Sequence, residues 1–166
     1  MFVLDASTPI LITKIELLDV FLANIGVDVT IPRAVERESC GGKKTLESLT
    51  IQKAVREKRI RVLSAESKLV AQLHEDFSLG RGEAEAIAIA VREKARVIGI
   101  DDKNGINACK LLGIPFTTTV GILLRSREKG LIGGAEASAR LSTLARYGRY
   151  KNSIVEDARL RLEEMQ

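Results

Sequence analysis

Two kinds of apolar pattern alternate along the chain. Short apolar or β-branched runs predict strands at residues 2–4, 27–32, 60–64, 96–100 and 114–119. Apolar residues at helical spacing predict helices at residues 7–25, 33–40, 45–59, 67–77, 83–95 and 104–113. From Val120 onward only the helical pattern remains, in segments 120–130, 135–148 and 153–166. This alternation is typical of βαβ units, in which a mainly parallel sheet lies between layers of helices, so the sequence predicts an α/β fold.

Local signals refine the helix boundaries. Ser7 or Thr8 is a suitable N-cap for the first helix, because Pro9 then falls in its first turn. The glycines at 41–42 end the helix before them. In residues 83–95, after a turn at LGRG, apolar side chains run almost all the way round the helix, which predicts a central and buried position.

Length and composition fit one sizeable core. At 166 residues and 45% hydrophobic content, a single domain is the default expectation. Aromatic residues make up only 4%, so aliphatic side chains must build that core. We expect residues 1–132 to form the α/β unit and residues 133–166 to form a helical extension that packs on it or continues the same domain.

The cysteines and the hydropathy of the chain indicate the cellular compartment of the protein. Cys40 and Cys109 lie far apart with no third partner, which argues against a zinc site and against a disulfide-stapled secreted domain. Residues 1–9 lack the basic and long apolar regions of a signal peptide, and no apolar run is long enough to span a bilayer. The expectation is a soluble, cytoplasmic protein without a membrane partner.

The net charge of +4 is unevenly distributed. Residues 43–61 and 125–151 each carry seven basic and two acidic side chains, whereas the rest of the chain holds 12 basic and 18 acidic ones. Such a chain can hold a polyanion at its edges and a cation at its centre. Two solvated helix faces explain the basic runs equally well.

Carboxylates follow two of the predicted strands. Asp5 comes directly after residues 2–4, and Asp101 and Asp102 come directly after residues 96–100. In an open parallel sheet, ligands bind outside the carboxyl ends of the strands, so these side chains meet if both strands are central. Asp101 is nearer to its strand and is favoured as the cleft residue. Asp102 is favoured as the cap of the next helix or as an outer partner.

Two further acidic pairs lie at predicted helix positions, Glu36 with Glu38 and Glu83 with Glu85. Residues two apart on a helix point to nearly opposite sides, so only one of each pair can face a given cleft. Several close carboxylates repel each other unless a cation lies between them, and Mg²⁺ or Mn²⁺ prefers oxygen ligands. Taken singly, each acid also has a structural explanation, such as a helix cap or a surface ion pair, but capping does not explain Asp5.

Five segments in a fixed order carry a family resemblance: VLDAS, IPRAVERE, GRGEAEAIAIA, IGIDDKNGINACKLLGI and TTTVGILLRSREKGLI. Together, over residues 2–132, they resemble the PIN domain, and most of all its subgroup with a G-E-x-E-A helix and an Asp-Asp strand end. The resemblance implies a Rossmann-like three-layer α/β/α sandwich. It also implies a ribonuclease that depends on Mg²⁺ or Mn²⁺, most familiarly a toxin of the VapC type.

The resemblance assigns roles to individual residues. The catalytic candidates are Asp5, Glu38, Glu83, Asp101 and Asp102, of which all but Asp102 would bind the metal. The secondary candidates are Ser7, Glu85 and Thr119 from the resemblance, and Glu36 as the other acid of its pair. Two positions depart from the family pattern. Ile106 stands where an Arg usually follows the Asp-Asp pair, and the usual T-G-T reads as three threonines at 117–119.

The implied reaction is endonucleolytic hydrolysis of single-stranded RNA by a metal-bound water. The residues expected to hold the RNA backbone are Lys53, Arg56, Lys58, Arg59, Arg125, Arg127 and Lys129. The scarcity of aromatics predicts little base stacking and weak sequence readout. A homodimer and an antitoxin partner are further expectations from the resemblance.

Other classes of function stay open. A PIN-fold protein that binds RNA with weak or no catalysis shares most of the pattern, although acids at all four positions favour the enzyme. A dinucleotide-binding Rossmann protein fits poorly, because no G-x-G-x-x-G follows the first strand. Metal-dependent phosphatase chemistry is compatible with the same acids.

Overall fold

The computed structural model describes residues 1–40 and 45–165, and this part of the chain contains a five-stranded sheet. Its strands are β1 (Phe2–Leu4), β2 (Val29–Pro32), β3 (Ile60–Leu63), β4 (Val97–Gly99) and β5 (Phe116–Thr117). They lie in the order β3-β2-β1-β4-β5, and every neighbouring pair is parallel. The predicted parallel sheet is confirmed, with β1 at its centre and β4 beside it.

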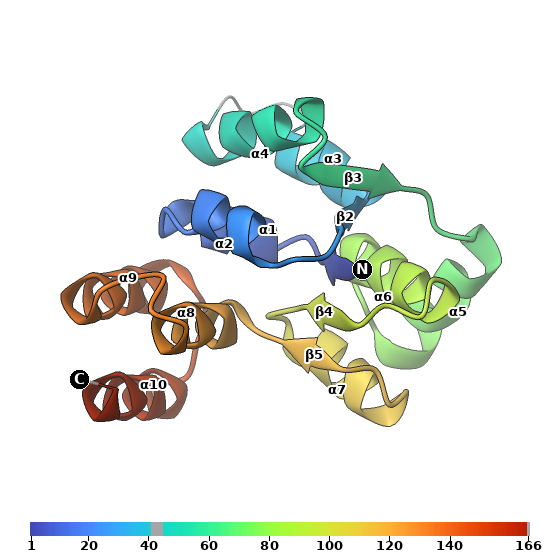
Figure 1. Ribbon diagram of the computed structural model, residues 1–166. Helices are drawn as coiled ribbons and strands as arrows, with labels where there is room; N and C mark the ends of the chain where they lie inside the picture. Colours follow the sequence, from blue (N-terminus) through green and yellow to red (C-terminus); the bar gives the residue numbers. More distant parts are fainter. Residues whose placement is uncertain (41–44, 166) are drawn as a thin grey trace.

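Helices cover both faces of this sheet (Figure 1). The helices are α1 (Thr8–Lys14), α2 (Leu18–Asn24), α3 (Arg33–Cys40), α4 (Leu46–Arg56), α5 (Ser67–Phe77), α6 (Arg81–Arg92), α7 (Lys103–Leu111), α8 (Thr119–Glu128), α9 (Gly134–Tyr147) and α10 (Asn152–Glu164). Because side chains alternate along a strand, Phe2 and Leu4 join the apolar cluster of α1, α2, α4 and α8, and Val3 joins that of α5, α6 and α7. The expected α/β/α sandwich is confirmed.

The prediction of one continuous helix over residues 7–25 is wrong. The structure has two helices there, α1 and α2, with Glu16 between them in the left-handed region at a φ of 55°. The Leu17 N–H donates to the Ile12 carbonyl across this turn, and the Leu17 side chain is 0% exposed. Apolar residues at 15, 17 and 18 do not share one face of a straight helix, so the chain turns to bury all of them.

Helix α6 is buried, as its apolar pattern predicts. Every residue from Ala84 to Ala90 is buried. The helix begins at Arg81 after an extended Gly80, so the last two residues of the predicted LGRG turn form its first turn instead. The glycines predicted to end α3 lie outside the described residues.

The last two helices pack beside α8 and against each other (Figure 1). Leu141 and Leu144 of α9 and Ala158 and Leu162 of α10 belong to the same buried cluster as Leu4 in the central strand. This packing brings the connection between α9 and α10 close to the carboxyl ends of β1 and β4, where Tyr150 touches Asp101. Among the described residues, no helix has both the length and the hydropathy needed to cross a membrane.

Candidate active site

Asp5 and Asp101 leave the sheet side by side. Leu4 is the register partner of Gly99, and the Asp5 N–H donates to the Gly99 carbonyl at 3.0 Å, so the ends of β1 and β4 are level. Asp5 follows β1 directly and Asp101 follows β4 by two residues. The parallel register therefore places these two carboxylates at one edge of the sheet, as the strand pattern predicts.

The Asp5 carboxylate is 0% exposed. Its Oδ1 accepts the N–H groups of Thr8 at 2.8 Å and Ser7 at 3.2 Å, and its Oδ2 accepts the Ser7 hydroxyl at 3.0 Å. Ser7 occupies the N-cap position of α1, but its hydroxyl bonds Asp5 and caps nothing. Burial raises the pKa of Asp5 to about 7; the hydrogen bonds from Thr8 and Ser7 oppose this rise, and the charge of Asp101 adds to it.

Asp101 accepts four hydrogen bonds. The Thr119 N–H at 2.9 Å and the Tyr150 hydroxyl donate to its Oδ1. The hydroxyls of Thr8 at 2.9 Å and Thr119 at 2.7 Å donate to its Oδ2. Thr8 therefore bridges the two aspartates, with its N–H on Asp5 and its hydroxyl on Asp101. All four acceptor positions of the Asp101 carboxylate are occupied.

Two of these residues are absent from the sequence-based site. The sequence pattern indicates Thr8 only as a helix cap, although it stands three residues after Asp5, the spacing at which a carboxylate accepts a backbone N–H at the start of a helix. Tyr150 lies 49 residues from Asp101 in the helical C-terminal segment, and no local pattern connects the two. Packing of α9 and α10 beside α8 brings them together.

The glutamates form a second group around the start of α6. Glu38 is exposed, but its carboxylate approaches the loop after Asp5. A Cβ at position 82 would lie 2.8 Å from the Cβ of Ala6 and 3.4 Å from Glu38 Oε2, so only glycine allows α6 to come this close to the loop. Partial burial raises the pKa of Glu38, and the negative charges of Glu83 and Glu85 raise it further.

The remaining glutamates of the two acidic pairs have structural partners. Glu85 is buried, and it accepts the Ala34 N–H at 3.0 Å and Arg81 Nε at 3.1 Å, so it ties α6 to the start of α3. The Glu83 carboxylate folds back over Gly80 at the N-terminus of its own helix. Glu36 pairs with Arg33 at 3.8 Å on the surface.

The donor set of the aspartate pair suits a hard cation. Its ligands are oxygens, and in the part of the chain that the structure describes neither Asp5 nor Asp101 forms an ion pair with a basic side chain. Among the described residues, the Ser7 hydroxyl is the one donor to Asp5 Oδ2, so this oxygen has room for a further partner. Among the side chains that the structure describes, however, no three acidic, histidine or cysteine groups are close enough to share a metal ion.

Comparison with known families agrees with this arrangement. A family model described as a PIN domain matches residues 1–164, nearly the whole chain. The chain belongs to the PIN domain family. No curated protein and no solved structure matches it. PIN domains are generally nucleases and typically use divalent metal ions. The matched region of this PIN domain extends through α9 and α10 and so includes Tyr150.

Asp102 of this PIN domain is the N-cap of α7. Its Oδ1 accepts the N–H groups of Asn104 at 2.8 Å and Gly105 at 3.0 Å. The prediction that Asp102 caps the next helix is confirmed, and its carboxylate lies outside the hydrogen-bond network of the aspartate pair.

The basic candidates of the PIN domain differ in their surroundings. Arg127 donates to the Met165 carbonyl at 2.6 Å, so it fastens α8 to the end of α10. Arg59 pairs with Asp19 at 2.6 Å, and Lys53 pairs with Glu57 at 3.8 Å. Arg56 and Lys58 are exposed, as is Arg125 in its pair with Glu128 at 2.8 Å. Paired surface cations can exchange their partner for a phosphate, because such pairs are weak.

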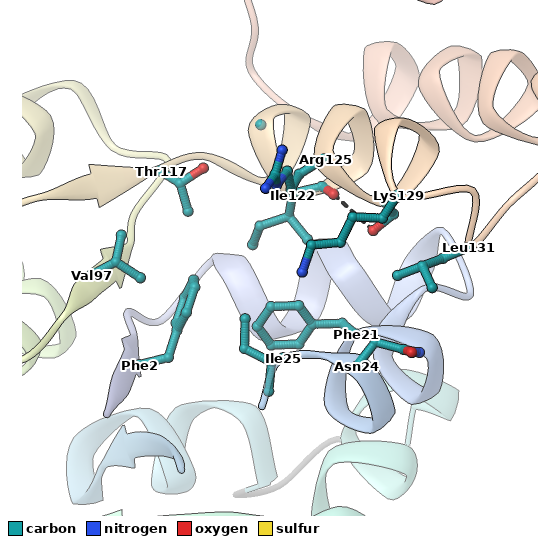
Figure 2. A pocket seen from close by; sticks show the side chains of 12 residues that line it. Phe2, Phe21, Asn24, Ile25, Val97, Thr117, Ile122, Arg125, Lys129 and Leu131 are labelled. Carbon is teal, nitrogen blue, oxygen red and sulfur yellow. Dashed lines mark hydrogen bonds between the residues drawn. The ribbon is translucent and has the colours of Figure 1, made fainter. Parts of the chain in front are cut away.

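Arg125 and Lys129 also border a largely apolar pocket of about 220 Å³ (Figure 2). Phe2 and Val97, the first residues of β1 and β4, line one side of it. Phe21 and other residues of α2 form the side that faces α8. The aspartates follow the opposite ends of these strands, so the pocket is separate from the acidic site.

Proposed function

We propose that this PIN domain is a metal-dependent endonuclease that hydrolyses the phosphodiester bonds of single-stranded RNA. The observation that supports the proposal most is the buried Asp5 carboxylate beside Asp101, with no basic side chain of the described residues to neutralise either. Such a pair favours binding of a cation, because repulsion and desolvation otherwise disfavour its charged state.

Each residue near the pair has a role in this proposal. Asp5 and Asp101 would bind Mg²⁺ or Mn²⁺, which as a Lewis acid lowers the pKa of a bound water. Thr8 and Thr119 orient the Asp101 carboxylate, and Ser7 orients that of Asp5. Glu38 lies beside Ala6 and would complete the acidic site, together with Glu83 after rotation of its side chain away from Gly80.

The exposed cations would bind the RNA backbone. Arg56, Lys58 and Arg125 have side chains at the surface, where a phosphate can reach them. Binding through phosphates weakens steeply with salt, with a slope of about −0.7 per contact for single strands in a plot of log K against log salt concentration.

Cleavage of matched oligonucleotides tests the proposal. The protein with Mn²⁺ should cut a single-stranded RNA and leave the single-stranded DNA of the same sequence intact. Asp5→Asn should reduce cleavage to background, because the buried metal ligand loses its charge. Glu38→Gln should reduce cleavage about tenfold or more.

Glu36→Gln is the matched control, because it changes the other glutamate of the same helix and should leave cleavage unchanged. Undiminished cleavage by Asp5→Asn would assign the activity to other residues or to a contaminant. Equal cleavage of DNA would refute the RNA specificity.

A second candidate is a PIN-fold RNA-binding protein with weak or no catalysis. The four occupied acceptor positions of Asp101 favour it, because direct metal binding there has to displace or share a donor. Calorimetric titration of the wild-type protein with Mn²⁺ separates the two candidates. Tight RNA binding without Mn²⁺ binding at millimolar metal would support the second.

The family resemblance also leads us to propose a toxin role, with a homodimer and an antitoxin as partners. If the nuclease is a toxin, its expression should stop growth and Asp5→Asn should restore it. Sedimentation of the purified protein tests the dimer, and co-expression with adjacent reading frames tests the antitoxin.

A further inference from the structure

The connection between α9 and α10 reaches the acidic site. It consists of residues 148–151, and in it Tyr150 directs its hydroxyl to Asp101 Oδ1. The Tyr150 ring packs against the apolar cluster that contains residues of β1, α8, α9 and α10. Because this packing fixes the ring, it also fixes the position of the hydroxyl beside Asp101.

The backbone is adapted to this position of the ring. Gly148 ends α9 in an extended conformation with a φ of −81°, which any residue can adopt. A Cβ at position 148 would nevertheless collide with the Tyr150 ring and would lie 2.9 Å from the Leu144 carbonyl oxygen. Position 148 therefore requires glycine, because the Tyr150 ring occupies the space that a Cβ would need.

The Tyr150 hydroxyl completes the restraint of the Asp101 carboxylate. Thr8 and Thr119 hold Oδ2 with two hydroxyls, whereas Oδ1 accepts the Thr119 N–H and the Tyr150 hydroxyl. The Tyr150 hydroxyl is the donor of this hydrogen bond, because an ionised carboxylate can only accept. Without this donor Oδ1 keeps one partner, and the carboxylate gains rotational freedom.

We propose that Tyr150 is a positioning residue that holds the Asp101 carboxylate in the orientation needed for metal binding. The C-terminal helical pair then completes the acidic site, since it supplies one of the four donors to Asp101. This inference rests on the proposed metal-dependent function. It goes beyond that function because it gives the segment after residue 133 a role in metal binding.

Tyr150→Phe tests the proposal, because it removes the hydroxyl and keeps the ring. Donors to a metal-binding side chain typically contribute 10- to 100-fold to metal affinity, so Mn²⁺ binding measured by calorimetry without RNA should weaken about tenfold. The Mn²⁺ concentration that gives half-maximal cleavage should rise by about the same factor. The cleavage rate at saturating Mn²⁺ should stay close to that of the wild type.

Tyr147→Phe is the matched control. It removes the same hydroxyl from the last residue of α9, where the side chain is 54% exposed and its ring contacts Lys14 Nζ. Its Mn²⁺ affinity should equal that of the wild type. Gly148→Ala is a second variant, which keeps the Tyr150 hydroxyl but displaces the ring, and it should weaken Mn²⁺ binding in the same direction.

Four results would overturn the proposal. Unchanged Mn²⁺ affinity in both Tyr150→Phe and Gly148→Ala would show that the hydroxyl does not orient the ligand. Tighter binding in Tyr150→Phe would show that the hydroxyl competes with the metal. A lower rate at every Mn²⁺ concentration with unchanged affinity would indicate a structural role only. Failure of the wild-type protein to bind Mn²⁺ would refute both this proposal and the proposed function, whereas the other results leave the function intact.

Discussion

Asp5 and Glu85 are both buried carboxylates, with 0% and 8% of their surface exposed, but they differ in their partners. Glu85 meets the guanidinium of Arg81 and the N–H of Ala34, which together compensate its charge. Asp5 has donors only from Ser7 and Thr8, and no cation within the described segments pairs with it. The same chemical group is therefore a structural tie in one place and an uncompensated charge in the other.

The difference in their partners indicates which of the two carboxylates belongs to a functional site. A buried charge that lacks a counter-charge destabilises the fold, and proteins tolerate this mainly where the charge binds or reacts. A buried charge that is paired and hydrogen-bonded stabilises its surroundings. Counting acids near a cleft does not separate the two cases, whereas their partners do.

The largest expected effect is on the stability of Asp5→Asn. Burial raises the pKa of Asp5 from an ordinary 3.8 to about 7, so between these pH values the folded state holds a proton that the unfolded chain releases. Stability of the metal-free wild type therefore falls as pH rises from about 4 to 7. The difference between the two pKa values lowers the free energy of unfolding by about 4 kcal/mol at pH 8. Asn carries no charge at any pH, so Asp5→Asn should be more stable than the wild type by up to this amount.

Urea unfolding in the presence of EDTA at pH 4 and pH 8 measures this difference. It should disappear at pH 4, where both forms are neutral in the folded state. Added Mn²⁺ should stabilise the wild type and leave Asp5→Asn unchanged, because only a folded state that binds the ligand gains stability from it. A difference in stability that is the same at both pH values would contradict the raised pKa.

The sequence predicts the aspartate pair on one condition. Strand ends follow from the apolar runs, and parallel strands bring their carboxyl ends to one edge, so Asp5 and Asp101 meet if both strands are central, which the strand order of the structure confirms. The cap by Asp102 follows from its place before a helix. These predictions depend on backbone periodicity, which local sequence determines.

Other parts of the site depend on packing between distant segments. The resemblance favours Glu83 over Glu85, but the pattern cannot show that Glu85 bonds the Ala34 N–H, 51 residues away. Tyr150 likewise reaches Asp101 only because α9 and α10 pack beside α8. The turn at Glu16 has a local cause, three apolar residues that need burial, but no glycine or proline marks it.

Glu85→Ala should have the next largest effect on stability, and it should destabilise the protein. It leaves the buried Ala34 N–H without an acceptor and Arg81 without its partner, which should lower the free energy of unfolding by about 2 kcal/mol. Mn²⁺ affinity should not change. Glu83→Ala is the control and should lower the stability by less than about 1 kcal/mol, because its carboxylate lies over Gly80 at the start of its own helix. A loss of Mn²⁺ binding in Glu85→Ala with normal stability would place Glu85 in the site and remove the contrast with Asp5.

The smallest expected effect is that of Asp102→Ala, which extends the comparison to the exposed neighbour of Asp101. Its carboxylate accepts the N–H groups of Asn104 and Gly105, so the variant should lose about 1 kcal/mol of stability at neutral pH, measured by urea unfolding. Asp102→Asn should retain most of this stability, because an amide oxygen caps a helix as well as a carboxylate does. Neither variant should alter Mn²⁺ affinity, whereas Asp101→Asn should abolish Mn²⁺ binding. Weaker Mn²⁺ binding in Asp102→Asn would mean that the charge of Asp102 acts on the metal, and that the two adjacent aspartates share one role.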